Sequence, residues 1–319
     1  MSNDGGATVT LSEIAREVEG LVANLERVVV GKRPTLELAV ATLLAGGHLL
    51  LQDVPGVGKT MLGRALARSI GGTFKRIQAT PDLLPSDITG GMVYDARGGT
   101  LRFVPGPLFA NVVLADELNR TTPRSQAAFM EAMDEGQVSV EGTAHPLPSP
   151  FFLIATLNPV EHHGTYPIPE GQLDRFLVST SLGYPAPSDE VEVIARQQRG
   201  HPLETLQPVV MPEQVVRWQR RVREVFVDRS LMTYAVEIAS ATRAHPDTAL
   251  GASPRASLGL VRLAQAWGLA KRREFVLPDD LKFLAPAVFT HRLVVRARAS
   301  AAAIIEDVLG TVPVPVITR

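Results

Sequence analysis

Two kinds of hydrophobic pattern alternate along the first two thirds of the chain. In the stretches predicted to be helical, apolar residues recur with the spacing of helices packed on a sheet, as in Leu62, Leu66 and Ile70. The second pattern lies between these stretches. Short continuous apolar runs are typical of strands buried on both faces of a parallel sheet. Such strands are predicted at residues 49–52, 112–115, 151–155 and 176–182, with a shorter one at 74–77. This alternation predicts an α/β domain with a parallel five-stranded sheet flanked by helices.

Beyond about residue 206 the pattern becomes helical throughout. Helices are predicted at residues 213–225, 230–244, 256–271 and 278–289. A Gly-His-Pro segment at 200–202 precedes this change and suggests a boundary. We therefore expect a disordered tail at residues 1–8, an α/β domain at 9–204 and a small all-helical domain at 205–319.

Local signals place further elements in the α/β domain. Thr122 followed by Pro123 is typical of a helix start, and Gly136 is typical of its end. Glycines within residues 94–100, between β-compatible flanks, predict a hairpin. Other helices are predicted at residues 11–28, 34–45, 61–70 and 188–199.

Composition agrees with an ordered globular chain and excludes several classes of site. A length of 319 residues favours about two domains. The net charge is −1 and only 5% of the residues are aromatic, which disfavours binding to nucleic acid. The lack of cysteine excludes disulfides and thiolate metal sites. No signal-peptide pattern or uninterrupted apolar span is found, so we expect a cytoplasmic chain without membrane insertion.

The most informative segment is the turn that follows the strand at 49–52. The turn ends in Gly58-Lys59-Thr60 and a helical pattern begins at once, which is the layout of a phosphate-binding loop. Glycines at 56 and 58 let backbone N–H groups face phosphate oxygens. Lys59 would then reach the β- and γ-phosphates, and the Thr60 hydroxyl would bind Mg²⁺. The segment predicts a site for a nucleoside triphosphate with Mg²⁺.

One position departs from the strict form of this loop. The pattern G-x-x-x-x-G-K-[ST] has glycine where this chain has Asp53. The loop alone therefore leaves two interpretations open. It is either a phosphate site or a strand–turn–helix connection whose glycines serve only the turn.

A second strand-end motif favours the phosphate site. Asp116 and Glu117 follow the apolar run at 112–115. In P-loop nucleoside triphosphatases, the strand beside the loop delivers an aspartate to the metal, and Asp116 suits that role through a bridging water. Glu117 is suited to orient or deprotonate the attacking water. Together the two motifs predict a nucleotide hydrolase.

Three further polar residues stand where such an enzyme has functional groups. Asn158 follows a strand, at the edge where parallel sheets bind ligands, although an Asn-Pro turn is the structural alternative. Arg175 precedes the strand at 176–182, and its permanently charged guanidinium suits the charge that grows on the transferred phosphoryl group. Arg255 stands at the start of the helix predicted over 256–271.

The order of these motifs resembles that in AAA+ ATPases, and their sequences are similar to those of the MoxR family. The resemblance covers roughly residues 10–295 and is carried by residues 53–60, 115–120, 166–176 and 253–257. It implies a P-loop AAA+ module followed by a helical lid. Members of the family often lack the first glycine of the loop, so Asp53 is compatible with it.

The resemblance also implies roles for the site residues, with ATP and Mg²⁺ as cofactors. Asp116 and Glu117 correspond to Walker B, Asn158 to sensor 1, Arg175 to the arginine finger and Arg255 to sensor 2. Val30 and Gly31 would flank the adenine. The residues expected to be catalytic are Glu117, Asn158, Arg175, Arg255 and Lys59. Those expected to bind the nucleotide are Pro55, Gly56, Val57, Gly58, Lys59, Thr60, Met61 and Asp116, with Thr60 and Asp116 also serving the metal.

Assembly and partners follow from the same resemblance. It implies a homo-oligomeric ring, expected to be a hexamer, in which Arg175 serves the nucleotide of the adjacent copy. Residues 138–150 resemble the hairpin that precedes sensor 1. The hairpin at 94–100 resembles an insertion that points into the ring channel; a simple surface hairpin is the alternative. The resemblance implies chaperone-like remodelling of client proteins, with insertion of metal cofactors as one form of this activity. It also implies von Willebrand factor A domain proteins as partners.

Two other functions stay open at this point. One is a magnesium-chelatase-like or nucleic-acid motor, and the neutral net charge disfavours the nucleic-acid motor. The other is a nucleotide-gated binding scaffold with negligible hydrolysis, which the paired carboxylates Asp116 and Glu117 disfavour.

Overall fold

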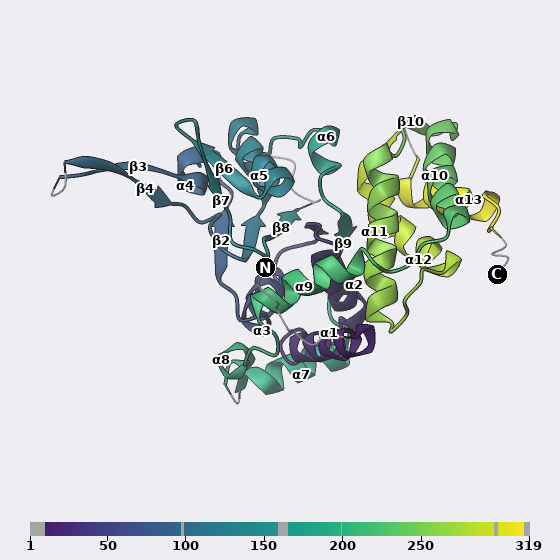
Figure 1. Ribbon diagram of the computed structural model, residues 1–319, viewed down its shortest axis with the longest axis horizontal. Helices are drawn as coiled ribbons and strands as arrows, with labels where there is room; N and C mark the ends of the chain where they lie inside the picture. The colour runs from purple at the N-terminus through teal and green to yellow at the C-terminus, as the bar shows by residue number, and fades with distance from the viewer. Residues whose placement is uncertain (1–9, 97–98, 159–164, 199, 297–298, 316–319) are drawn as a thin grey trace, which may run out of the picture.

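An α/β part built around one sheet is followed by a mostly helical part (Figure 1). The computed structural model describes residues 10–96, 99–158, 165–198, 200–296 and 299–315. The tail predicted at residues 1–8 and positions 97–98 of the predicted hairpin lie outside this described part. The fold class predicted from the hydrophobic pattern is confirmed.

The sheet contains five parallel strands in the order β2-β5-β8-β1-β9. All five residues of β5 are buried, which explains why it is a continuous apolar run rather than an alternating one. Because the strands are parallel, their carboxyl ends meet at one edge of the sheet, where ligands bind in such folds. The strands are β1 Leu49–Gln52, β2 Phe74–Gln78, β5 Val112–Asp116, β8 Phe152–Leu157 and β9 Val178–Thr180.

Alternate residues of each strand enter different hydrophobic cores. Leu49 and Leu51 pack on one face with the helices α1, α2 and α3, whereas Leu50 packs on the other face with α5. The sheet is therefore covered on both sides. These helices are α1 Leu11–Glu26, α2 Arg33–Leu44, α3 Lys59–Ser69 and α5 Pro123–Glu135.

The limits of α5 match the local signals in the sequence. The Thr122 side chain caps the helix by accepting a hydrogen bond from the Ser125 N–H, and Pro123 occupies its first turn. Gly136 ends it in the left-handed region, at φ 63°. The remaining short helices of this part are α4 Pro85–Thr89, η1 Leu118–Arg120, α6 Glu170–Leu173 and α8 Pro202–Thr205, and α7 spans Pro187–Gln198.

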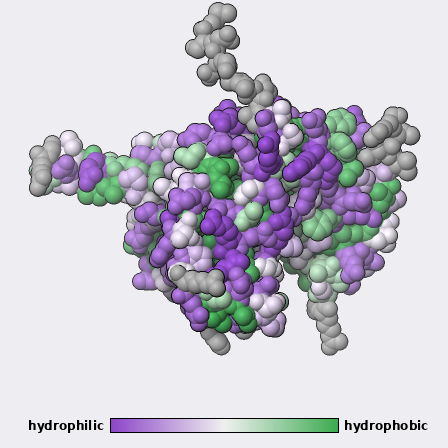
Figure 2. Space-filling model, turned by 90° about the horizontal axis from the view of Figure 1, so that it is seen from below, coloured by the Kyte–Doolittle hydropathy of each residue, from purple (hydrophilic) through white to green (hydrophobic). Residues whose placement is uncertain are grey.

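Two antiparallel hairpins are inserted into the α/β part. The first, β3 Gly90–Asp95 with β4 Thr100–Pro105, forms an arm that projects from the body in Figures 1 and 2. The second, β6 Gln137–Val140 with β7 Thr143–Pro146, lies near its base, where Phe103 stacks on His145 with ring centroids 3.8 Å apart. Both hairpins were predicted, and both are confirmed.

The arm keeps large apolar side chains exposed. Tyr94 and Leu101 are opposite each other in the register and are 63% and 64% exposed, and Met92 lies on the same face. Hydrophobic atoms on the arm are visible in green in Figure 2. Such a face suits contact with another polypeptide.

The C-terminal part consists of helices and one short strand pair. Helix α11 packs against α1 and α2 of the α/β part, so the two parts are in direct contact. The pair β10 Thr248–Leu250 and β11 Val294–Val295 was missed by the sequence pattern, which predicted helices throughout. The helices are α9 Pro212–Val222, α10 Arg229–Ala244, α11 Pro254–Ala270, α12 Pro278–Phe289, η2 Thr290–Arg292 and α13 Ala301–Thr311. Among the described residues, no helix is both long enough and apolar enough to cross a membrane.

Candidate functional site

The turn between β1 and α3 adopts a conformation that depends on glycine. Gly56 has φ 86° and Gly58 has φ 99°, both in the left-handed region. Gly58 is the N-cap of α3, so the helix begins at Lys59 and its first N–H groups face the turn. The Lys59 Nζ donates to the carbonyls of Asp53 (3.0 Å) and Val54 (3.3 Å). The loop thus places an ammonium group and a helix N-terminus around one cavity.

Asp53, the departure from the strict loop pattern, anchors the loop. Its buried carboxylate accepts hydrogen bonds from the backbone N–H groups of Leu182 (2.6 Å) and Gly183 (2.9 Å). These residues follow β9, the edge strand that pairs with β1. The side chain therefore fixes the start of the loop to the neighbouring strand end, a role that glycine cannot perform.

A cavity of about 250 Å³ lies above the loop. Most of the predicted nucleotide-site residues share it, including both carboxylates of the strand-end motif. Two residues of β2 also line it and were not predicted. The lining residues are Pro55, Gly56, Gly58, Lys59, Thr60, Met61, Arg76, Gln78, Asp116 and Glu117.

The Thr156 hydroxyl orients the two carboxylate-bearing residues at the end of β5. It donates to Asp116 Oδ1 at 2.7 Å and accepts the Glu117 N–H at 2.8 Å. Glu117 has φ 57°, an uncommon conformation for a residue other than glycine. Strain of this kind is typical of functional sites.

Each carboxylate has a charged or polar partner from its own chain. Asp116 Oδ2 accepts from Arg76 Nη2 at 2.5 Å and from Arg76 Nε at 3.1 Å. Glu117 forms an ion pair with Arg120 at 2.9 Å and accepts from Gln78 Nε2 at 3.3 Å. Both acids are therefore oriented within the protein itself.

The donor atoms of this cavity fit Mg²⁺. The Thr60 hydroxyl and the Asp116 carboxylate are hard oxygen ligands, and Mg²⁺ is usually bound by one or two such groups together with substrate phosphates. Over the described residues, no cluster of three or more His, Cys, Asp or Glu side chains is arranged to hold a metal. Held by these residues, Mg²⁺ would neutralise negative charge on a bound phosphate group.

Asn158 and the loop at residues 30–31 are not among the residues that line this cavity. Asn158 follows β8, whose last residue Leu157 accepts a hydrogen bond from the Asp53 N–H at 3.2 Å. Gly31 has φ 71°, and an added Cβ there would overlap the Asp189 carboxylate. The loop therefore packs on the start of α7, downstream of the segment that Asp53 anchors.

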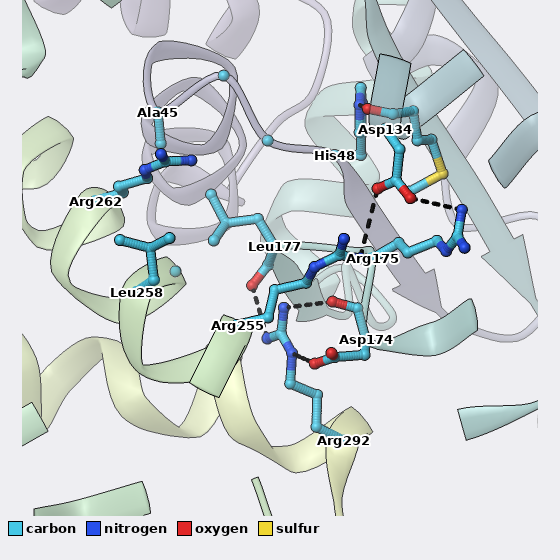
Figure 3. A pocket seen from close by; sticks show the side chains of 14 residues that line it. Ala45, His48, Asp134, Asp174, Arg175, Leu177, Arg255, Leu258, Arg262 and Arg292 are labelled. Atoms are coloured by element: carbon cyan, nitrogen blue, oxygen red, sulfur yellow. Dashed lines mark hydrogen bonds and ion pairs between the residues drawn. The ribbon is translucent and has the colours of Figure 1, made fainter. Parts of the chain in front are cut away.

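Arg175 and Arg255 lie in a second cavity, of about 280 Å³, shown in Figure 3. Arg175 forms an ion pair with Asp134 at 2.6 Å and donates to the Met130 carbonyl at 3.1 Å. Arg255 contacts the other oxygen of Asp134 at 3.4 Å. The two predicted arginines are thus brought together at the end of α5, and neither lines the cavity of Lys59.

A buried ion pair supports this arginine cavity. Arg292 is 5% exposed, and its Nε donates to Asp174 Oδ1 at 2.8 Å. Burial lowers the pKa of Arg292 to about 10, although the Asp174 carboxylate opposes that shift. Asp174 also accepts from the Ser253 hydroxyl, which caps α11. The pair therefore fixes the helix start that carries Arg255.

Two histidines near this cavity are buried: His48, which lines it, and His291, which precedes Arg292. His48 accepts the Leu153 N–H at Nδ1 and contacts the Met133 carbonyl through Nε2 at 3.1 Å, so the neutral ring with a proton on Nε2 satisfies both contacts. Burial lowers the pKa of His48 to about 4. Burial, together with the nearby Arg292 charge, lowers the pKa of His291 to about 3.

Comparisons with known proteins agree with this architecture. Residues 48–178 match the family described as "ATPase family associated with various cellular activities (AAA)", and residues 240–308 match the family described as "AAA lid domain". The protein YeaC of Bacillus subtilis, named as uncharacterised, is 50% identical over 92% of this chain and 94% of its own. Chaperone MoxR1 of Mycobacterium tuberculosis is 40% identical over 98% of this chain and 85% of its own.

A solved structure is similar over nearly the whole chain. The crystal structure of a Cytophaga hutchinsonii protein described as a candidate ATPase has a TM-score of 0.89 and 35% sequence identity. The similarity covers 96% of this chain and 97% of that one. Both parts of the molecule therefore occur together in related proteins.

Proposed function

The chain belongs to the MoxR family of AAA+ ATPases, and we propose that it hydrolyses Mg·ATP at the contacts between neighbouring copies in a ring. One observation carries this proposal. The phosphate-loop cavity and the arginine cavity are separate within one chain, although fast phosphoryl transfer uses both kinds of group at one phosphate. An assembly in which each copy contributes its arginines to the next copy's cavity supplies both. By family resemblance, we expect a hexamer.

The phosphate-loop cavity would hold the nucleotide. Backbone N–H groups around Gly56, Gly58 and the start of α3 face the phosphates, and Lys59 exchanges its carbonyl partners for phosphate oxygens. Thr60 and Asp116 would hold Mg²⁺. Val30 and Gly31, on the loop beside the anchored segment, would flank the adenine.

Glu117 would act on the attacking water, with Asn158 supporting its position. The water oxygen forms a bond to the γ-phosphorus while the bond from that phosphorus to ADP breaks, and Glu117 receives the water proton. Charge spread over the phosphoryl oxygens would be stabilised by Arg175 of the adjacent copy, assisted by Arg255. The products are ADP and inorganic phosphate.

Arg175→Ala tests the contribution between copies. We expect turnover of the assembled protein to fall by about 10³–10⁵-fold, the effect typical of an arginine finger, while nucleotide binding persists. Steady-state phosphate release is measured on rings verified by light scattering. Arg217→Ala, on the exposed face of α9, is the matched control. Turnover within a few-fold of the parent chain would overturn the proposal.

We further propose that hydrolysis drives chaperone-like remodelling of partner proteins. The support is the named role of the related MoxR1, a chaperone, and the arm β3–β4, which exposes Met92, Tyr94 and Leu101. In a ring, the arm would face the channel and contact a client. The family resemblance adds von Willebrand factor A domain proteins as partners and metal cofactor insertion as one outcome. Capture of partners by Glu117→Gln in ATP, but not by the same variant in ADP, tests this role.

A further inference from the structure

Arg76 of β2 contacts Oδ2 of Asp116, the carboxylate oxygen that would serve the metal. Its Nη2 donates to Asp116 Oδ2 at 2.5 Å and its Nε donates to the same oxygen at 3.1 Å. The same Nη2 donates to Gln78 Oε1 at 2.7 Å. The side chain of Asp116 is 12% exposed and that of Arg76 is 45% exposed. The guanidinium therefore approaches a nearly buried carboxylate from the open side of the cavity.

The geometry of β2 explains why Arg76 reaches this position. β2 is the edge strand beside β5, with Gln78 paired to Asp116 in the parallel register. Residues two apart on a strand lie on one face, so Arg76 and Gln78 both face the cavity and Lys75 faces away. Arg76 contacts Asp116 through side-chain atoms alone, so the guanidinium can leave Asp116 without breaking a hydrogen bond between strands.

The other oxygen of Asp116 is already occupied. Oδ1 accepts the Thr156 hydroxyl in a buried hydrogen bond, which leaves Oδ2 as the oxygen directed toward the cavity. A guanidinium on Oδ2 and a divalent cation served by the same carboxylate carry like charges in one cavity and repel each other. Both cannot use Oδ2 in the arrangement described here.

We propose that Arg76 is the resident counter-ion of Asp116 and competes with the divalent cation for it. This inference rests on the proposed function, in which Asp116 serves the metal. Arg76 is accordingly a positioning residue that sets how much divalent cation the nucleotide site requires. When the metal–nucleotide pair binds, the guanidinium leaves Oδ2 and remains in the cavity beside Gln78.

The test measures metal affinity rather than turnover. Mn²⁺ is titrated into the protein with ADP kept below the protein concentration, and free Mn²⁺ is measured by electron paramagnetic resonance. We expect Arg76→Ala to bind Mn²⁺ about fivefold more tightly than the parent chain, the effect of removing one partly exposed competing charge. Arg76→Lys, which keeps the charge but not the planar fork, should fall between the two.

Lys75→Ala is the matched control, because it removes the same charge from the adjacent position on the opposite face of β2. Equal changes in Arg76→Ala and Lys75→Ala would overturn the inference, since they indicate a general charge effect. Weaker Mn²⁺ binding in Arg76→Ala would also overturn it, by making Arg76 a partner of the metal–nucleotide pair. If the parent chain binds no Mn²⁺ with ADP, the proposed nucleotide site itself fails.

Discussion

The phosphate-loop cavity and the arginine cavity differ in how they hold their charges. In the first, Lys59 rests on backbone carbonyls and the acids Asp116 and Glu117 each have an internal cationic partner. In the second, four guanidiniums line the wall with only two carboxylates, Asp134 and Asp174. The first cavity has the glycine turn and helix start that we propose to hold a triphosphate, whereas the second has an excess of positive charge and no comparable loop among its lining residues. The first cavity supplies the loop and the two acids, and the second supplies the arginines that the first does not receive from its own chain.

The supports of the two cavities also differ. The phosphate loop is anchored at the sheet edge, where Asp53 ties it to the segment after β9. The arginine cavity depends on buried groups. Arg292 with Asp174 and His291 with the Phe176 carbonyl connect the C-terminal part to the α/β part. The neutral His48 joins α5 to β8 within the α/β part. We therefore expect changes in the first region to affect nucleotide chemistry and changes in the second to affect stability as well.

The largest effect within the phosphate-loop cavity is expected for Glu117→Gln. Loss of the general base should lower turnover by about 10²–10⁴-fold, while ATP remains bound because Lys59 and the loop are intact. Single-turnover phosphate release and retention of labelled ATP measure the two quantities. Normal turnover in this variant would remove Glu117 from its assigned role.

Acid should weaken the region around the arginine cavity. His48 is neutral in the folded state, with its pKa lowered to about 4, whereas the unfolded chain has a value of about 6.5. The unfolded state therefore binds more protons between these values, and stability falls as pH drops from about 6.5 toward 4. The full contribution of His48 is on the order of 3 kcal/mol.

Urea unfolding at pH 7.5, 6 and 5 measures this dependence. His48→Gln, which keeps a donor and an acceptor, should flatten the profile, while the exposed His201→Gln should leave it unchanged. An unchanged slope in His48→Gln would show that the loss of stability has another source. His291, with its pKa lowered to about 3, extends the same dependence to lower pH.

Asp53→Gly restores the strict loop pattern at the start of the phosphate loop. We nevertheless expect the free energy of unfolding to fall by about 1–3 kcal/mol, because the backbone N–H groups of Leu182 and Gly183 lose their acceptor. Nucleotide affinity should fall with it. Asp53→Asn, which keeps one acceptor oxygen, is the milder comparison. Tighter nucleotide binding in Asp53→Gly would contradict the anchoring role.

The smallest effect is expected for Asp134→Asn in the arginine cavity. The shared carboxylate orients Arg175 and Arg255, so its loss should lower the turnover of the assembled protein about two- to fivefold, as for a partly exposed ion pair. Glu135→Gln, the next position on α5, is the control. Nucleotide affinity of the same variant should stay at the parent value; a weaker affinity would contradict the separation of the two cavities.

The sequence predicted the sheet and the phosphate loop because both have local signals. Buried parallel strands are continuous apolar runs, and the loop concentrates its glycines and Lys59 in one short segment. α13 was missed because its alanine-rich start carries no helical period, and the strands β10 and β11 are too short for alternation to appear.

The features of the site that the sequence did not predict depend on contacts between residues that are far apart in the chain. The bond from Leu182 to Asp53 joins residues 129 apart, and the pairing of Arg76 with Asp116 joins residues 40 apart. Arg76 and Gln78 did carry a local signal, two polar residues with strand spacing beside an acidic strand end. That signal becomes specific only once β2 is known to flank β5.

A mixing experiment tests the central proposal most directly. Lys59→Ala lacks a working phosphate-loop cavity, and Arg175→Ala lacks the arginine, so each variant alone should release phosphate very slowly. In mixed rings, about one contact in four by random pairing joins an intact cavity to an intact arginine. We predict that mixing restores a clear part of the parent activity. A mixture no more active than the two separate variants would contradict hydrolysis shared between neighbouring copies.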